Sequence, residues 1–181
     1  MVFSAPIFIF GFLPIALLLY FVSPRAIKNI VLLILSLAFY AWGEVFYVAI
    51  MIASIILNFT AGKLIFASVE DQRRAKLWLL VGVGLNLLLL VSFKYANFIA
   101  DNMNSLLGTF GVQPIDLAPV HLPLGISFFT FQAISYIVDV YRKQVPAQNN
   151  LFNLALYISL FPQLIAGPIV RYKDVANQIL N

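Results

Sequence analysis

Long apolar runs, separated by short polar segments, repeat along the chain. At 1.5 Å per residue, about 20 apolar residues are needed to cross the roughly 30 Å hydrocarbon core of a bilayer. Five runs predict membrane-spanning helices: Val2–Val22, Ile27–Trp42, Val45–Phe66, Leu77–Ala100 and Pro123–Tyr141. The second run reaches only about 24 Å and must borrow residues at its ends. Between the fourth and fifth runs, Asp101–Leu122 is predicted to be a polar loop.

The fifth run carries polar residues at helical spacing. At 100° per residue, Gln132, Ser135 and Asp139 fall on one face, with Tyr136 and Lys143 close beside them. Unpaired polar groups are costly in hydrocarbon, so this face must meet protein or water. The fifth helix is therefore predicted to lie against other parts of the chain.

The final apolar run, Leu151–Val170, is interrupted by Pro162 and by Gly167-Pro168. Proline removes a backbone donor and breaks a helix, and irregular backbone at membrane depth must be buried in protein or line a cavity. We therefore expect a broken, re-entrant segment that enters the membrane and returns to the same side. The polar face of Gln132 and Ser135 is expected to supply partners for the freed backbone, with a polar pocket between the two segments.

Composition points to lipid as the surrounding solvent. Of 181 residues, 62% are hydrophobic and only 10% are charged, against about 25% charged in soluble domains, and the mean hydropathy is +0.97. The chain has no cysteine and a single histidine, His121, so disulfides, thiolate metal sites and histidine clusters are excluded and no metal is expected. The predicted fold is all-α, a single polytopic transmembrane domain over residues 1–181.

Basic residues mark one side of the membrane. Basic residues follow the first, third and fifth runs: Arg25, Lys28, Lys63, Arg73, Arg74, Lys76, Arg142 and Lys143. The alternate loops carry acidic residues instead: Glu44, Asp101 and Asp116. The positive-inside rule then puts the basic loops in the cytoplasm and the N-terminus outside. This alternation explains the net charge of +4 better than nucleic-acid binding does, so no nucleic-acid partner is expected. The first run lacks the basic flank and cleavage site of a signal peptide and is expected to remain a membrane helix.

Several charged residues allow two interpretations. Asp139 can pair with Lys143 or Arg142 at helical spacing, either as a charged helix end at the interface or as part of an entrance for a cytoplasmic donor. Lys94 interrupts the fourth run and is expected to snorkel outward and pair with Asp101.

The remaining polar residues are candidates for structural contacts or for substrate binding. Gln132 and Ser135 suit interhelical hydrogen bonds or the lining of a substrate tunnel. Gln163 and Arg171, in the broken segment, are the residues expected to contact substrate. His121 is interpreted as a loop histidine, because no carboxylate lies near it in sequence, although one could approach through space.

Two stretches, LPLGISFFTFQAISYIVDVYR (Leu122–Arg142) and FPQLIAGPIVRY (Phe161–Tyr172), resemble the membrane-bound O-acyltransferase family. The opening MVFSAPIFIFGFLPIALLLYF and the FYAWGE of Phe39–Glu44 resemble its bacterial branch, which includes the proteins of alginate O-acetylation. The resemblance covers essentially the whole chain. It implies an inner-membrane enzyme that moves an acetyl or similar small acyl group to an extracytoplasmic polysaccharide.

The resemblance also implies substrates and partners. The acyl donor would be acetyl-CoA or an acyl carrier, used as a co-substrate with no bound cofactor, and periplasmic acetylation proteins would be partners beside the lipid bilayer. The substrate-binding set carried by the matching motifs and by the polar face is Gln132, Ser135, Asp139, Gln163 and Arg171. No catalytic residue is assigned.

One departure from the family pattern concerns the histidine. Members of the family are longer, and their invariant histidine lies in the later half, whereas His121 precedes LPLGISFF. The chain is therefore interpreted as the N-terminal part of such a protein and is expected to transfer no acyl group alone. The alternative is a small helical channel or transporter subunit, with Lys94, Gln132 and Asp139 as polar groups of a pore.

Overall fold

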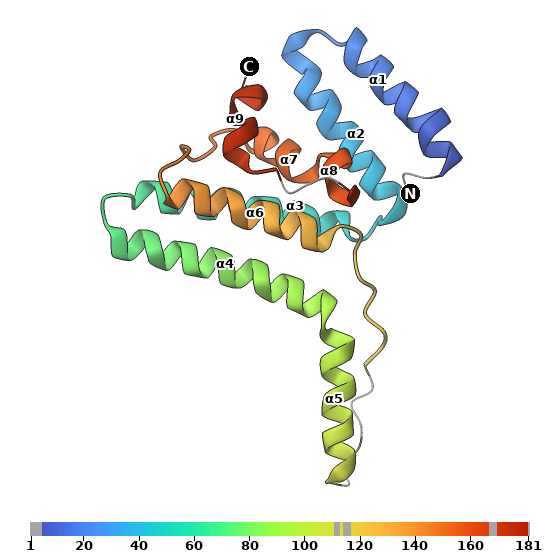
Figure 1. The fold of residues 1–181 in the computed structure, drawn as a ribbon, viewed down its shortest axis with the longest axis vertical. Coiled ribbons are helices and arrows are strands. Elements are labelled where there is room, and N and C mark those ends of the chain that lie inside the picture. Colours follow the sequence, from blue (N-terminus) through green and yellow to red (C-terminus); the bar gives the residue numbers. More distant parts are fainter. Residues whose placement is uncertain (1–4, 111–112, 114–116, 167–169, 181) are drawn as a thin grey trace.

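The chain forms a helical bundle with one helix projecting from it (Figure 1). The structure, a computed structural model, describes residues 5–110, 113, 117–166 and 170–180. Their helical elements are η1 (Phe8–Phe12), α1 (Leu13–Val22), η2 (Arg25–Ile27), α2 (Lys28–Gly43), α3 (Val48–Ala67), α4 (Gln72–Lys94), α5 (Ala96–Thr109), α6 (Ile126–Tyr141), α7 (Leu151–Ser159), α8 (Phe161–Ala166) and α9 (Tyr172–Leu180). The described residues include no strand, so the predicted all-α class is confirmed.

Among the described residues, three helical segments are long and apolar enough to cross a membrane: Arg25–Gly43, Val48–Ala67 and Gln72–Lys94. Two shorter apolar segments, Phe8–Val22 and Ile126–Tyr141, correspond to the first and fifth predicted spans. The second span does borrow residues at its ends, as its length required. Although α6 has only 16 residues, nine of them are buried, so α6 is surrounded mainly by protein rather than by lipid.

The centre of the bundle is made by α3, α4 and α6. Gly62 of α3 lies directly under the ring of Tyr136, where an added Cβ would be 2.5 Å from the Tyr136 hydroxyl. Between α3 and α4, Asn58 and Asn86 donate to one another's side-chain oxygens at 3.0 and 2.8 Å. Both asparagines are buried. Small residues and paired amides thus hold helices together where lipid supplies no hydrophobic drive.

An aromatic cluster joins the N-terminal helices to the final segment. Phe8 and Phe12 are the first and last residues of η1, and Phe39 of α2 and Phe161 of α8 meet them, with ring centroids 5.3 to 6.2 Å apart. The first apolar run is this π-helical stretch followed by α1, in which Pro14 occupies the first turn. Proline is tolerated there because the first backbone N–H groups of a helix lack intrahelical partners.

The fourth predicted span is wrong at its C-terminal end. Helix α4 stops at Lys94, Tyr95 leaves helical geometry at φ −117° and ψ 1°, and α5 departs in a new direction (Figure 1). The residues predicted as a loop from Asp101 are helical to Thr109. The turn is stabilised through space, because the Asn97 side chain donates to the Val120 carbonyl at 3.1 Å and accepts from the Val120 N–H at 2.9 Å. Asp116, counted among the acidic loop residues, lies outside the described residues.

The predicted break in the final apolar run is confirmed. Helix α7 ends at Ser159, Leu160 adopts φ −56° and ψ 111°, and α8 begins at Phe161, with Pro162 in its first turn. The segment then returns to where it began, because the Gln148 amide before α7 donates to the Tyr172 hydroxyl at the start of α9, at 2.8 Å. A straight crossing helix is therefore excluded. The second predicted weak point, Gly167-Pro168, lies outside the described residues.

Candidate functional site

The polar face of α6 lies against the final segment. Gly125, the residue directly before α6, is left-handed with a φ of 69°, and an added Cβ there would be 2.7 Å from the Leu164 carbonyl oxygen. Glycine at this position lets the backbone of α8 approach the start of α6 closely. From there the two segments run beside one another, and the predicted residues on both sides meet in pairs.

Gln132 and Gln163 form the deeper pair. The Gln132 amide donates to the side-chain oxygen of Gln163 at 2.7 Å, and Gln132 is 1% exposed. The side-chain oxygen of Gln132 is buried without a hydrogen-bond partner among the described residues. Leaving a buried acceptor unpaired costs about 1–3 kcal/mol, so this oxygen marks a place where a water or a substrate donor can bind.

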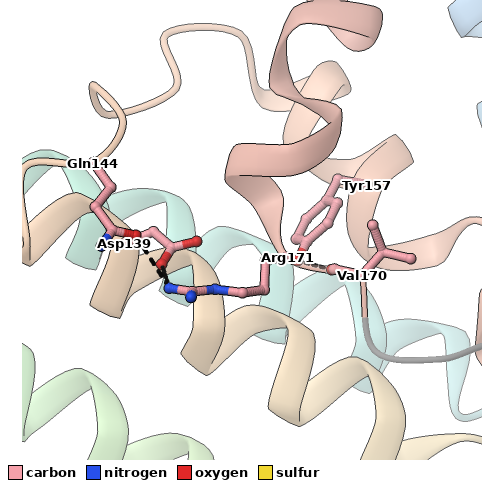
Figure 2. A network of polar contacts seen from close by, with 5 residues as sticks. All are labelled: Asp139, Gln144, Tyr157, Val170 and Arg171. Carbon is pink, nitrogen blue, oxygen red and sulfur yellow. Dashed lines mark hydrogen bonds and ion pairs between the residues drawn. The ribbon is translucent and has the colours of Figure 1, made fainter.

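Asp139 and Arg171 form the second pair, which Figure 2 shows together with Gln144. The Arg171 guanidinium donates to one carboxylate oxygen of Asp139 and, at 3.2 Å, to the side-chain oxygen of Gln144. The Asp139 side chain is fully buried, and that of Arg171 is 37% exposed. The second carboxylate oxygen of Asp139 has no hydrogen-bond partner among the described residues. The pair therefore presents a buried carboxylate oxygen that can accept a hydrogen bond. It also presents a part-exposed guanidinium, a group with five N–H donors in all.

Ser135 completes the predicted face through a tyrosine. It lies within hydrogen-bonding reach of the Tyr157 side chain on α7. The Tyr157 hydroxyl donates to the Val170 carbonyl at 2.8 Å, directly before Arg171 (Figure 2). Tyr157 thus fixes the backbone that positions the guanidinium. All five predicted binding residues, Gln132, Ser135, Asp139, Gln163 and Arg171, lie along this one contact between α6 and the final segment.

Sequence reasoning missed the residues that hold this contact closed. The Gln148 N–H donates to the Tyr136 hydroxyl at 3.0 Å, and its amide donates to Tyr172. The Tyr172 ring packs edge-on against Tyr136 and Tyr157, with centroids 5.1 Å apart in each case. Burial raises the pKa of Tyr172, against a lowering by the Gln148 hydrogen bond. The phenol is therefore neutral at physiological pH, and no local sequence signal indicated these contacts.

The freed backbone at the helix break finds a partner on a different helix from the one expected. The Phe161 N–H donates to the Ser36 hydroxyl of α2 at 3.3 Å, whereas Gln132 contacts a side chain of α8 and not its backbone. The prediction that α6 satisfies this backbone is wrong. Gln163 also lines a pocket of about 250 Å³, whose other walls come from the α1–α2 hairpin, α7 and α9. No residue of α6 is among those that line this pocket.

The predicted pairing of Asp139 with Lys143 or Arg142 is also wrong, because Asp139 pairs with Arg171. Instead, α6 ends in a Schellman motif. Lys143 is left-handed at φ 58°, and the N–H groups of Lys143 and Gln144 donate to the carbonyls of Val140 and Asp139, each at 3.0 Å. Lys143 and Arg142 are exposed, as expected of a charged helix end.

At the opposite end of the bundle, His121 meets an acidic residue that is distant in sequence. Its Nε2 lies 3.0 Å from a carboxylate oxygen of Glu44, and its ring lies 5.5 Å from that of Tyr47. The Glu44 side chain is 11% exposed and that of His121 is 64% exposed. The carboxylate that was not found near His121 in sequence has thus arrived through space, at the far end from Asp139.

The polar groups named for a channel are not assembled into a pore. Lys94 is exposed at the end of α4, with its ammonium 5.5 Å from the Tyr95 ring centroid, whereas Gln132 and Asp139 are buried and engaged with the final segment. The expected ion pair of Lys94 with Asp101 is not among those formed by the described residues. The predicted pairing required Lys94 and Asp101 to lie on one face of a continuous helix. The helix breaks at Tyr95, so the two residues belong to different helices.

The contact between α6 and the final segment presents polar groups suited to binding a ligand. It offers two buried acceptor oxygens and a part-exposed guanidinium, a combination suited to a ligand with both an anionic group and hydrogen-bond donors. The described residues contain no group of three or more histidine, aspartate or glutamate side chains that could hold a metal ion.

Comparison with known proteins finds relatives that match essentially the whole chain. The chain is 45% identical over 181 residues to the probable alginate O-acetylase AlgI of Pseudomonas putida, covering all of this chain and 37% of that protein. It is 45% identical over 178 residues to the protein of the same name from Pseudomonas aeruginosa, covering 98% of this chain and 34% of that protein.

A relative with another substrate in its name also matches. The peptidoglycan O-acetyltransferase of Helicobacter pylori is 34% identical over 217 aligned positions, covering all of this chain and 40% of that protein. No protein-family model matches the chain, and no solved structure matches it significantly. The chain spans little more than a third of the length of the relatives that it matches.

Proposed function

We propose that this chain, homologous over its whole length to bacterial O-acetylases, is the N-terminal membrane part of an O-acyltransferase acting on an extracytoplasmic polysaccharide. Homology to alginate O-acetylases, at 45% identity, confirms the resemblance found in the motifs. The named relatives include enzymes for alginate and for peptidoglycan, so a polysaccharide is the acceptor class that they share. The group transferred is an acetyl or a similar small acyl group.

The observation that carries the proposal is the Asp139–Arg171 pair. The Asp139 side chain is fully buried and binds the guanidinium of Arg171, whose side chain is 37% exposed. A guanidinium anchored in this way is preorganised to bind an anionic group. Acetyl-CoA and acyl carriers both present phosphates, and Arg171 lies at the same end of the bundle as Arg142 and Lys143. We assign Arg171 to binding the anionic part of the acyl donor.

The other predicted residues continue from this anchor into the bundle. Ser135, Gln132 and Gln163 follow Asp139 towards the start of α6, and the unpaired oxygen of Gln132 is available to a donor N–H or to a bound water. These residues position the acyl end of the donor. The acceptor polysaccharide would arrive from the other side of the inner membrane, delivered by periplasmic partner proteins, and no resident cofactor is needed.

Activity in cells tests the donor site. The gene, as it stands in the cell, is replaced by variants, and the acetyl esters on the exported polysaccharide are quantified by proton NMR. Arg171→Gln is expected to reduce acetylation strongly and Arg171→Lys to leave an intermediate level, because lysine keeps the charge but loses the planar fork. Arg74→Gln is the matched control, since Arg74 is exposed and forms its ion pair with the neighbouring Asp71. Wild-type acetylation by Arg171→Gln, at an equal membrane level by immunoblot, would contradict the proposal.

Orientation is tested separately. We propose an inner-membrane location with the N-terminus outside and the basic loops in the cytoplasm, because lysine and arginine follow alternate spans. The chain has no cysteine, so single cysteines at Gln72 and Gln113, both exposed, can be labelled in intact cells with an impermeant maleimide. Labelling is expected at Gln113→Cys and absent at Gln72→Cys until the membrane is permeabilised. The reverse pattern would overturn the orientation.

A further inference from the structure

An apolar groove of about 600 Å³ lies between the N-terminal helices and the final segment. Its walls include Phe8, Leu13, Ala16, Leu32, Phe161 and Pro162, and the aromatic cluster of Phe8, Phe12, Phe39 and Phe161 lies beside its deep end. Figure 1 shows α1 and α2 standing as a hairpin beside α7 and α8. In water such a groove would be a liability, but this chain is surrounded by lipid.

The groove becomes polar at one end. The pocket of about 250 Å³ described above shares Tyr20, Leu32 and Leu160 with it, so the two hollows adjoin. The second pocket adds the polar side chains of Asn29 and Gln178 to its wall. Apolar and polar linings therefore follow one another along a single path, which is the arrangement that an amphiphile requires.

Positive charge gathers at the polar end. The ammonium of Lys28 lies 4.7 Å from the centroid of the Tyr20 ring, which lines both pockets. Arg25 lies one turn earlier and is exposed. Basic residues at the membrane surface attract anionic lipid head groups. The charge favours an anionic amphiphile over a neutral one.

The length of the groove fits one leaflet of a bilayer. From Lys28 to Phe39, eleven residues along α2, the helix rises about 16 Å, close to half of the roughly 30 Å hydrocarbon core. A lipid with its head group at Lys28 would therefore place the end of its acyl chain near the aromatic cluster. Neither a soluble metabolite nor a lipid of the opposite leaflet has this match of length and polarity.

We propose that this groove is a binding site for one anionic glycerophospholipid of the leaflet at the basic side of the protein. One acyl chain lies between α1, α2 and the Leu160–Pro162 break, and the phosphate is held near Lys28 and Asn29. The broken segment carries Gln163 and Arg171, which pair with residues of α6. The lipid then supports this segment from the side opposite α6. The polar end of this site shares Gln163 with the proposed acyl-donor site, but the proposal does not depend on the proposed enzymatic function.

Photolabelling in a defined bilayer tests the proposal. The chain is reconstituted into phosphatidylcholine nanodiscs containing phosphatidylglycerol with a diazirine near the end of one acyl chain, and cross-linked peptides are mapped by mass spectrometry. Cross-links are expected on Leu13, Phe161 and Pro162, which line the groove beside the aromatic cluster, in excess over residues on the outer faces of the same helices. The same label on phosphatidylcholine is expected to give weaker cross-linking. Labelling spread evenly over all lipid-facing residues would overturn the site.

Two filling variants and one matched control make the test specific. Ala16→Phe, at a residue 4% exposed, and Leu17→Trp, at a more open position, both fill the groove, and groove cross-links are expected to fall to background in each. Leu18→Phe is the control, because Leu18 is 62% exposed and does not line the groove.

Lys28→Gln should reduce the preference for the anionic lipid by about fivefold, the effect of one basic residue at a membrane surface. Unchanged cross-links in Leu17→Trp, or an unchanged lipid preference in Lys28→Gln, would overturn the assignment.

Discussion

The contact between Gly62 and Tyr136 gives the sharpest test of the packing at the centre of the bundle. In Gly62→Ala, the new methyl carbon would lie 2.5 Å from the hydroxyl oxygen of Tyr136 and 2.8 Å from the nearest ring carbon. Favourable contacts between such atoms lie near 3.5–4.0 Å. The ring must therefore move by about 1 Å, or α3 and α6 must separate by that amount.

Tyr136 has little freedom to make this movement. It is fully buried, its hydroxyl accepts from the Gln148 N–H at 3.0 Å, and its ring packs against Tyr172. Overpacking a core typically costs about 1–3 kcal/mol, and leaving the buried Gln148 donor unpaired costs a further 1–3 kcal/mol or so. The better helix propensity of alanine returns about 1 kcal/mol. We expect a net loss of about 1–5 kcal/mol in the free energy of unfolding.

Gly84→Ala is the matched control. An added Cβ at Gly84 on α4 meets no atom within 4 Å, so only the helix propensity changes and the variant should be as stable as the parent or up to about 1 kcal/mol more stable. Both variants can be unfolded by SDS in mixed micelles and followed by the fluorescence of Trp42 and Trp78. Equal stability of Gly62→Ala and Gly84→Ala would refute the packing that we derive for α3 and α6.

Three further outcomes are expected in the same unfolding assay. Arg171→Gln should lose about 3–5 kcal/mol, because it leaves Asp139 buried and unpaired, and adding Asp139→Asn should recover part of that loss. Asn58→Leu and Asn86→Leu should each be destabilising by about 1–3 kcal/mol, because the remaining amide stays buried without its partner on the other helix, whereas the double variant should be close to neutral. Gly125→Ala should lose more than the 1–2 kcal/mol or so of a left-handed backbone, since its methyl group also meets the backbone of α8. Additive effects in the two paired cases, or a neutral Gly125→Ala, would count against these contacts.

The amino-acid sequence by itself determined the membrane class, the approximate apolar spans and the break before Pro162. These follow from local rules. A run of apolar residues partitions into lipid whatever its neighbours are, and a proline cannot continue a helix. The polar face of α6 was predictable for the same reason, because helical periodicity sets which of Gln132, Ser135 and Asp139 share a side.

Only the tertiary structure decided which partners those residues meet. Sequence spacing favoured Lys143 or Arg142 for Asp139, yet the returning chain brings Arg171 to it. Likewise, Glu44 reaches His121 across 77 residues. The end of α4 at Tyr95 was hidden too, because the turn is held by contacts between Asn97 and a distant loop. Local propensity carries no information on such pairings, because they exist only once the chain has folded back on itself.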